Sequence, residues 1–202
     1  TLRVRPDMLD GAPLTSGDME YLRETVEAAG RLRLGRNLHC ALVHYPVFLG
    51  DRKTGATSLT NLDVHDIARI SRTYGLSGLF VVTPLEDQRR LLQELLTHWT
   101  VGDGAASNPD RAEALALVRP ADSLAEVVES LTASCGMAPL VLGSSARPEL
   151  DKKGREKRPA LPFAAARKSL DKRPVLLVLG TSHGLAPEVL AQCEGVLPPL
   201  RW

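Results

Sequence analysis

The sequence contains few aromatic residues and almost no excess charge of either sign. Phenylalanine, tryptophan and tyrosine make up 4% of its 202 residues, and the formal net charge at pH 7 is +1. So few rings argue against a protein that binds single-stranded nucleic acid mainly by stacking bases on aromatic side chains. The near-neutral total gives no general attraction to nucleic acid, so any RNA contact must come from local basic patches.

Cysteines and long apolar runs are also scarce. The 3 cysteines, Cys40, Cys135 and Cys193, are odd in number and lack the spacing of a metal site. This usage favours a reduced, cytoplasmic protein without a metal centre. No apolar run approaches the ~20 residues that a membrane helix needs, and the first residues do not resemble a signal peptide. We therefore expect a cytoplasmic protein that makes no membrane contact.

The pattern of apolar and polar residues changes near residue 37. Residues 1–36 carry scattered arginines and one predicted helix, 16–29, which Ser16 can cap. We interpret this segment as the tail of an upstream domain and a linker. From residue 37 to 202, apolar strand-like runs alternate with helical stretches, which predicts an α/β domain with a mostly parallel sheet flanked by helices. The expected strands are 38–45, 79–82, 140–143 and 175–179, with a short one at 196–197, and the main expected helices are 62–75, 85–99 and 123–133.

The most informative stretch runs from Gly180 to Leu185 and has the sequence GTSHGL. It follows the apolar run 174–179, typical of a strand buried on both faces, and it precedes a plausible helix start at Pro187. Two glycines at such a turn allow bare backbone to approach a ligand. The pattern predicts a cofactor loop without naming the cofactor, and a plain strand-to-helix turn is the alternative. It matches neither G-x-G-x-x-G nor a P-loop.

A second informative stretch, residues 60–72, predicts a helix with a polar stripe. The stripe consists of Asn61, His65, Arg69 and Arg72, and the apolar face holds Val64, Ile67 and Ala68. A guanidinium such as that of Arg69 can bind a phosphate or stabilise negative charge on a reacting base. The alternative is a solvated helix face on which Asp66 pairs with Arg69.

Ligands of open α/β sheets bind at the carboxyl ends of the strands. In this chain those ends carry His44-Tyr45, Thr83-Pro84, Ser144-Ser145 and the turn after Gly180. The Pro-Pro pair at 198–199 leaves carbonyl groups free to accept hydrogen bonds, as an adenine amino group would require, or else marks a chain end without a role. The charged segment 147–158 is either a phosphate-binding loop or a solubilising surface loop.

Several blocks, taken in order, resemble the SPOUT class of bacterial RNA methyltransferase domains. The blocks are ALVHYPV at 41–47, TNLDVHDIAR at 60–69, VTPL at 82–85, NPDR at 108–111 and GTSHGL at 180–185. The similarity extends from residue 37 to about residue 200. It is to the version found alone or fused behind a tRNA (guanine-N1)-methyltransferase, and residues 1–22 resemble the end of that upstream enzyme.

The resemblance implies an α/β fold with a trefoil knot, a homodimer, and S-adenosyl-L-methionine as methyl donor. It places the donor on the loops that contain Thr83, Pro84, Gly180, Thr181, Gly184, Leu185, Leu197, Pro198 and Leu200. We expect Arg69, with Asn61, Asp63 and His65 nearby, to orient or activate the RNA nucleotide that accepts the methyl group. From their charge, we expect the basic side chains of Arg72, Arg147, Lys152, Lys153 and Arg155 to hold RNA phosphates. Related ribose methyltransferases have asparagine where this chain has Asp63. We therefore expect the details of the attack of the acceptor atom on the methyl group to differ.

We therefore predict an S-adenosylmethionine-dependent RNA methyltransferase that acts on tRNA as part of a fusion polypeptide. The family continues after the Leu-Pro-Pro turn into a segment with Asn-His-Leu-Ser that completes the knot and the donor site, whereas this sequence stops at Trp202. We expect weak donor binding and weak activity from this form. The alternative is a non-catalytic RNA-binding or dimerisation module that serves the upstream enzyme. A doubly wound nucleotide-binding enzyme is disfavoured, because the glycine spacing it requires is missing.

Overall fold

The computed structural model describes residues 12–31, 35, 37–50, 53–145 and 160–199, with the side chains of 26–31 left out of the description. The chain divides into two compact units, residues 1–33 and residues 34–202. Within the described residues, no helix is both long and apolar enough to cross a bilayer.

The described part of the first unit is the helix α1 (Ser16–Arg31). Its N-terminus is capped by Thr15, whose hydroxyl accepts a hydrogen bond from the backbone N–H of Asp18 at 3.2 Å. The carboxylate of Asp18 in turn accepts from the backbone N–H of Thr15 at 2.9 Å. The predicted helix is confirmed, but the cap lies one residue before Ser16, because the Thr15 side chain reaches the free N–H groups of the first turn.

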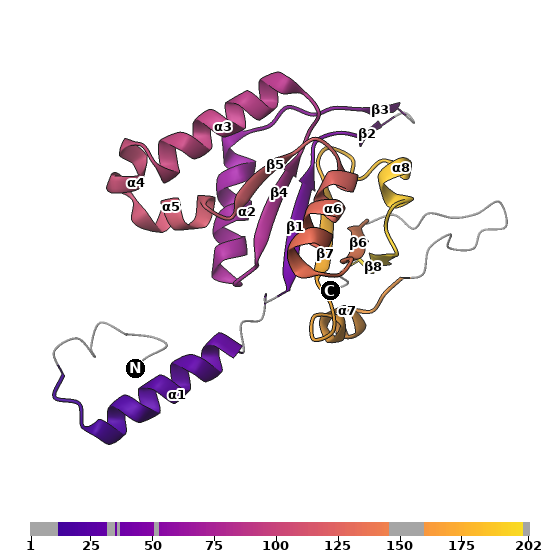
Figure 1. Cartoon of the computed structure of the whole chain (residues 1–202). Coiled ribbons are helices and arrows are strands. Elements are labelled where there is room, and N and C mark those ends of the chain that lie inside the picture. Colours follow the sequence, from indigo (N-terminus) through magenta and orange to yellow (C-terminus); the bar gives the residue numbers. More distant parts are fainter. Residues whose placement is uncertain (1–11, 32–34, 36, 51–52, 146–159, 200–202) are drawn as a thin grey trace. The chain divides into compact units, whose positions relative to one another are not determined.

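The second unit is built on a six-stranded sheet in which all neighbouring strands are parallel (Figure 1). The strand order is β5-β4-β1-β7-β6-β8. The strands are β1 (Leu38–Val43), β4 (Gly78–Val82), β5 (Val118–Ala121), β6 (Leu140–Ser144), β7 (Val175–Gly180) and β8 (Gly195–Leu197). The predicted α/β class with a mostly parallel sheet is confirmed.

Helices cover both faces of this sheet. They are α2 (Asn61–Thr73), α3 (Glu86–Thr100), α4 (Asp103–Ser107), α5 (Pro109–Leu115), α6 (Leu124–Cys135), α7 (Phe163–Ser169) and α8 (Pro187–Leu190). One core cluster joins α2, α3 and α5 to alternate strand residues such as Cys40 and Leu79. A second cluster joins α6 and α8 to the intervening residues, such as Ala41 and Phe80. Since successive strand residues point to opposite faces, α2 and α6 lie on opposite sides of the sheet (Figure 1).

A small antiparallel hairpin follows the end of β1. It consists of β2 (Val47–Gly50) and β3 (Lys53–Gly55). Val47 is fully buried in the core cluster of α6 and α8, whereas the side chains of Lys53 and Thr54 are exposed. The hairpin therefore stands at the carboxyl edge of the sheet, where it can contribute to a ligand site.

Candidate functional site

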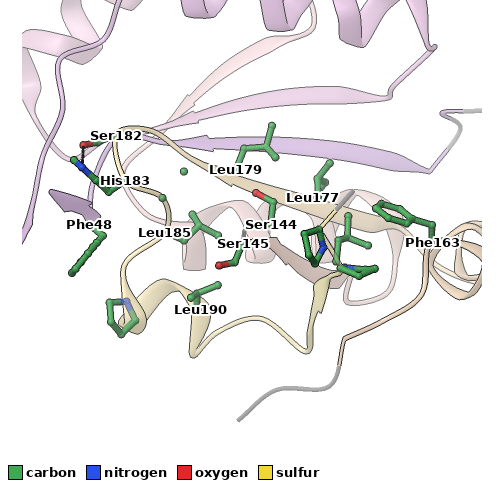
Figure 2. Close-up of a pocket in the computed structure, with 16 residues that line it drawn as sticks. Phe48, Ser144, Ser145, Phe163, Leu177, Leu179, Ser182, His183, Leu185 and Leu190 are labelled. Carbon is green, nitrogen blue, oxygen red and sulfur yellow. Dashed lines mark hydrogen bonds between the residues drawn. The ribbon is translucent and has the colours of Figure 1, made fainter. Parts of the chain in front are cut away.

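A cavity of about 1020 Å³ lies at the carboxyl ends of β6, β7 and β8 (Figure 2). Its apolar wall consists of Phe48, Phe163, Leu177, Leu179, Leu185, Leu190, Leu197 and three prolines, Pro187, Pro198 and Pro199. Its polar and glycine wall consists of Ser144, Ser145, Gly180, Ser182, His183 and Gly184. None of these described lining residues is an aspartate, glutamate, lysine or arginine. The cavity is therefore a mostly apolar, weakly charged pocket, the kind that accepts a small organic molecule.

The turn after β7 forms one wall of the cavity, and its shape depends on Gly180. A Cβ at this position would lie 2.5 Å from the backbone nitrogen of Leu185 and 2.6 Å from the carbonyl carbon of Gly184. Only glycine allows the chain to fold back on itself this tightly. The turn is closed by the N–H of Gly184, which donates to the carbonyl of Thr181 at 3.0 Å. Ser182 (φ 54°) and Gly184 (φ 106°) both have positive φ, so the loop holds a conformation that most residues avoid.

The hairpin is bonded to this turn through the main chain. The N–H of His183 donates to the carbonyl of Phe48 at 3.0 Å, and the N–H of Phe48 donates to the carbonyl of Gly184 at 2.9 Å. Val47 and Leu185 form an antiparallel bridge beside them. These bonds set the Phe48 side chain against the cavity, so two segments far apart in the sequence form one wall.

The remaining walls come from the ends of β6 and β8. Ser144 ends β6, Ser145 follows it, and Pro198 and Pro199 follow β8. Figure 2 shows Ser144 and Ser145 among the apolar side chains that surround the cavity. The two prolines have no N–H to donate, so only their carbonyls are available for polar contacts with a ligand.

Five of the residues predicted to hold a cofactor line the cavity: Gly180, Gly184, Leu185, Leu197 and Pro198. Thr181 belongs to the same turn but does not line the cavity, since its hydroxyl donates to the carbonyl of Val43 at 3.2 Å. Leu200 lies outside the described residues. The structure thus brings together most of the predicted residues from the turn and from the end of β8.

Thr83 and Pro84 do not line the cavity. Thr83 is fully buried, and its hydroxyl accepts from the N–H of Leu85 at 3.3 Å and contacts the side-chain oxygen of Gln88 at 3.4 Å. These contacts hold the start of α3. In the sheet, β1 lies between β4, which Thr83 follows, and β7.

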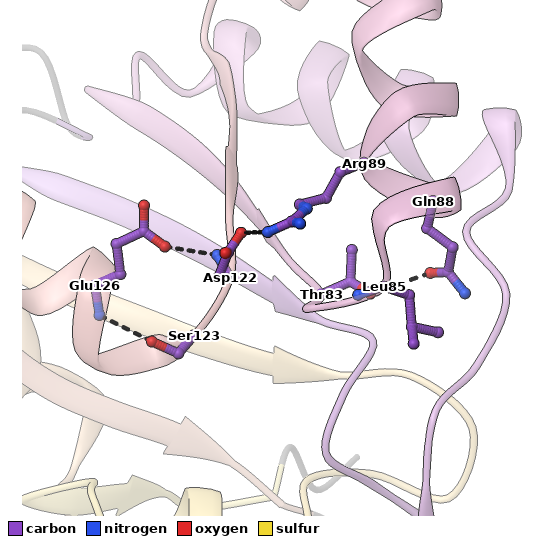
Figure 3. A network of polar contacts seen from close by, with 7 residues as sticks. All are labelled: Thr83, Leu85, Gln88, Arg89, Asp122, Ser123 and Glu126. Atoms are coloured by element: carbon purple, nitrogen blue, oxygen red, sulfur yellow. Dashed lines mark hydrogen bonds and ion pairs between the residues drawn. The ribbon is translucent and has the colours of Figure 1, made fainter.

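The residues around Thr83 form a polar network at the ends of β4 and β5 (Figure 3). Arg89 of α3 forms an ion pair with Asp122, and the carboxylate of Glu126 accepts from the backbone N–H of Asp122 at 2.6 Å. The hydroxyl of Ser123 accepts from the N–H of Glu126 at 3.2 Å and so caps α6. This network joins α3 and α6 to the sheet edge, which is a stabilising task separate from the cavity.

The four residues predicted to orient or activate an acceptor all lie on α2, and none of them lines the cavity. Asp63 caps the helix together with Thr60, whose hydroxyl donates to the Asp63 carboxylate at 2.6 Å. Arg69 forms an ion pair with Asp66, and its side chain is 61% exposed. Asn61 is exposed at the start of the helix.

His65 is half-buried on α2. Its ring meets the ring of Trp99 edge-on, with the centroids 5.6 Å apart. Burial lowers the pKa of His65, and the charges of Arg111 and Arg69 lower it further. Arg111 lies over the Trp99 ring, 4.4 Å from its centroid. His65 is therefore held neutral in the packing between α2, α3 and α5.

The predicted RNA contacts are mostly outside the described part of the chain. Arg147, Lys152, Lys153 and Arg155 are not described. Arg72 is described, and it forms an ion pair with Glu113 of α5.

The sequence did not predict a ligand contact for some of the residues that line the cavity. Ser144 and Ser145 were among the strand ends, but no cofactor contact was predicted for them. Their position after an apolar strand is the signal that could have found them. Phe48 and Phe163 carried no such signal, because the hairpin and α7 reach the cavity only through the tertiary fold.

The chain is similar to several known proteins. Residues 37–202 match the family model described as SAM-dependent RNA methyltransferase. The whole chain is 54% identical over 202 residues to a protein from Nitratidesulfovibrio vulgaris named tRNA (guanine-N(1)-)-methyltransferase, of which it covers 44%. A protein of the same name from Oleidesulfovibrio alaskensis is 47% identical over 201 residues, which is 100% of this chain and again 44% of that protein. The chain thus spans less than half the length of these relatives.

A solved structure supports the fold alone. The crystal structure of a methylase family protein from Neisseria gonorrhoeae superimposes with a TM-score of 0.51 at 16% sequence identity. The superposition covers 85% of this chain and 74% of that one.

Proposed function

The chain belongs to the family of SAM-dependent RNA methyltransferases, and from this membership we propose that the cavity at the ends of β6, β7 and β8 holds the methyl donor. The observation that carries the proposal is the position of the cavity, at the carboxyl ends of three neighbouring parallel strands. Ligands of open α/β sheets bind at this edge. The turn from Gly180 to Leu185 and the segment Leu197–Pro199 supply the walls that the sequence motifs favour.

The residues of the cavity fit S-adenosylmethionine. Its adenine ring requires flat apolar surroundings, which Leu177, Leu179 and Leu197 provide. A Cβ at Gly184 would meet no heavy atom within 4 Å, so open space adjoins the main chain there. The volume of about 1020 Å³ lies just above the ~300–1,000 Å³ typical of small-molecule pockets.

When bound, S-adenosylmethionine supplies a methyl group that its positively charged sulfur has already activated. The chain then has to hold the reacting atoms in line and exclude water. We assign the exclusion of water to the leucines of β7 and β8 together with Phe48. We assign polar contacts to the peptide groups of the Gly180 turn and to the hydroxyls of Ser144 and Ser145. Thr83 and Pro84 do not line the cavity, and Leu200 lies outside the described residues.

We propose that Arg69, with Asn61, Asp63 and His65, orients or activates the acceptor nucleotide. The buried residues Val64 and Ala68 of α2 belong to the same cluster as Leu179, which supports placing this helix on the sheet face toward which Leu179 points. The ion pair of Arg69 with Asp66 is exposed, and such pairs contribute little to stability. The guanidinium can therefore exchange Asp66 for an RNA phosphate.

We propose tRNA as the substrate, with the chain acting as part of a longer polypeptide behind a tRNA (guanine-N1)-methyltransferase. The support is that the similar proteins bearing this name are more than twice as long as the aligned region, 44% of each being covered. Residues 1–36 would then be the end of the upstream part. Arg72, Arg147, Lys152, Lys153 and Arg155 would contact phosphates, which makes binding depend on salt.

Three further features belong to the proposal: a homodimer, a trefoil knot and a cytoplasmic location. Leu62 and Ile70 of α2 and Tyr74, which follows it, are 70%, 56% and 61% exposed, and such apolar surface favours a protein interface. The knot is favoured by the strand order, since β7 enters between β1 and β6 after β6 is complete. Among the described residues, Cys40 and Cys135 form no disulfide, which suits a reducing compartment.

A labelling experiment tests the proposed function. The 202-residue chain, and the longer polypeptide beside it, are incubated with total tRNA and S-adenosylmethionine carrying a labelled methyl group. We expect labelled tRNA, and digestion followed by mass spectrometry then identifies the modified nucleoside. Absence of label in every class of RNA, with either protein, would contradict the proposal.

One observation favours a second candidate, a non-catalytic module for RNA binding or dimerisation. None of Asn61, Asp63, His65 and Arg69 lines the cavity of its own chain. This candidate predicts RNA binding that is unchanged by Arg69→Ala, together with no heat of binding when S-adenosylmethionine is titrated into the chain. The methyltransferase predicts a measurable donor affinity and a loss of methyl transfer in the same variant.

A further inference from the structure

A line of polar groups reaches the Gly180 turn at Thr181, a residue that does not line the cavity. It starts at His44, which follows β1 and is fully buried. The Nδ1 atom of His44 lies 3.2 Å from the hydroxyl of Thr57, and this hydroxyl lies 2.5 Å from the hydroxyl of Thr181. The Thr181 hydroxyl reaches the carbonyl of Val43 at 3.2 Å. The line therefore connects the end of β1 to the first residue of the turn after Gly180.

The number of protons on each group indicates which group donates and which accepts along this line. The carbonyl of Val43 can only accept, so the Thr181 hydroxyl donates to it. A hydroxyl has one proton, so with Thr181 donating to Val43 we assign Thr57 as the donor to Thr181 and an Nδ1–H of His44 as the donor to Thr57. The competing contact from the Thr57 hydroxyl to the carbonyl of His44 is longer, at 3.4 Å. His44 is then a neutral imidazole with its proton on Nδ1.

The other ring nitrogen fits this assignment. The Nε2 atom of His44 is buried and has no hydrogen-bond partner among the described residues. An N–H without an acceptor is rarer in proteins than an acceptor without a donor. The bare lone pair therefore belongs on Nε2 and the proton on Nδ1.

Thr57 is itself held firmly, so it can act as the central link. Its backbone N–H donates to the carbonyl of His44 at 2.9 Å. Its backbone carbonyl accepts from the side-chain amide of Gln88 at 3.1 Å. Two elements, the end of β1 and α3, thereby fix the position of the Thr57 hydroxyl.

We propose that this relay, from His44 through Thr57 and Thr181 to Val43, holds the Gly180 turn in the shape that receives the methyl donor. The turn contains a positive φ angle at the non-glycine residue Ser182, and such a conformation persists only where the surroundings enforce it. The hairpin bonds hold residues 183 and 184, and the relay holds residue 181, so both sides of Ser182 are fixed. His44 and Thr57 are then positioning residues for donor binding, an inference that rests on the proposed function of the cavity.

Two substitutions at Thr57 separate the hydrogen bond from the shape of the side chain. Thr57→Val removes the hydroxyl and keeps the volume, whereas Thr57→Ser keeps the hydroxyl. Thr97→Val is the matched control, since Thr97 is exposed on α3 and its hydroxyl only accepts from Gln93 at 3.4 Å. Amide hydrogen exchange of residues 181–184 is measured without donor, and donor affinity by calorimetric titration of S-adenosylmethionine.

We expect Thr57→Val to speed exchange of the turn amides and to weaken donor affinity, each by about five- to tenfold, the usual effect of one buried hydrogen bond. Thr57→Ser should stay within about twofold of the wild type for the same reason, and Thr97→Val should change neither quantity. Unchanged exchange and affinity in a folded Thr57→Val protein would overturn the proposal. If that variant does not fold, Thr181→Val and Thr181→Ser provide the same comparison.

The protonation of His44 gives a test that requires no substitution. Long-range ¹H–¹⁵N correlation spectra of the wild-type chain distinguish the two tautomers, and we expect the proton on Nδ1. A proton on Nε2 would break the proposed direction of the relay and overturn it. If the wild-type chain binds no donor, the proposed function fails, whereas the exchange and tautomer results still decide whether the relay holds the turn.

Discussion

At the scale of single residues, Gly180 is a position of the cavity wall where a larger side chain does not fit. The backbone of residues 184 and 185 passes where its Cβ would be. Backbone atoms cannot rotate away as a flexible side chain can, so a methyl group here must open the turn. The two bonds between the hairpin and the turn would then lose their alignment.

We predict that Gly180→Ala lowers the free energy of unfolding by about 1–3 kcal/mol, the usual cost of forcing a methyl group into packed structure. We also expect it to abolish measurable donor binding. Urea unfolding and calorimetric titration check the two effects. Gly17→Ala is the control, because a Cβ there meets only the Thr15 hydroxyl, at 3.8 Å. Wild-type donor affinity in Gly180→Ala would show that the turn does not form the donor site.

Buried histidines make the stability of this chain depend on pH. Burial is the main cause that lowers the pKa of His39, His44 and His65 below the ordinary value of 6.5. The charge of Arg119 lowers the pKa of His39 further, whereas the carboxylate of Asp63 partly opposes the effect at His44. The unfolded chain therefore binds more protons than the folded one just below pH 6.5. Stability from these groups is complete above that pH and is lost as the pH falls through it.

We accordingly expect the urea midpoint to fall between pH 7.5 and pH 5. His39→Leu removes a buried histidine whose Nδ1 has no hydrogen-bond partner among the described residues, so it should flatten the fall. His98→Gln is the control, since His98 is exposed. A midpoint that is constant, or that rises as the pH falls, would contradict this assignment.

At the scale of elements, the hairpin β2–β3 and the Gly180 turn work as one unit. Their backbone bonds place Phe48 against the cavity while Leu49, the next residue, is 40% exposed. The alternation of side chains along a strand thus gives two adjacent apolar residues different surroundings.

We predict that Phe48→Ala weakens donor affinity by about tenfold, because it removes apolar contact area from the cavity wall. Leu49→Ala should leave the affinity unchanged. Calorimetric titration of both variants measures the difference, and thermal unfolding reports whether the fold is retained. Equal effects of the two substitutions would mean that the hairpin acts only through stability.

Most elements of the second unit could be predicted from sequence, because their patterns are strong. The runs 79–82, 140–143 and 175–179 are apolar throughout, and they coincide with β4, β6 and β7. Strand β5 was not predicted, since Arg119 and Pro120 at its centre are exposed and only its two ends are buried. The short hairpin gave no signal either, as β3 carries the exposed polar residues Lys53 and Thr54.

The candidate site could be predicted only in part, for a physical reason. Sequence indicates which residues follow a strand, but not which strand ends lie side by side. Thr83 and Ser144 both follow apolar strands, and only the order of strands in the sheet puts Ser144 next to the Gly180 turn. The contact of Thr57 with Thr181, 124 residues apart, likewise depends on the finished fold.

At the scale of the whole second unit, the order of the strands creates the cavity. Strand β7 lies between β1 and β6, and β8 pairs with the far side of β6. Three segments from different parts of the chain therefore end beside one another, and α2 and α6 cover opposite faces around them. The methyl donor site that we propose is a product of this arrangement, and α2 would meet RNA on the face that it covers.

The most direct measurement of that central claim is a titration of S-adenosylmethionine into the ¹⁵N-labelled chain, followed by backbone amide chemical shifts. We predict that the largest changes occur at Gly180, Thr181, Gly184 and Leu185, with further changes at Ser144 and Leu197 and little change at Thr83. Saturable changes centred on Thr83, with the turn after β7 unaffected, would contradict the account, as would spectra that do not change at all.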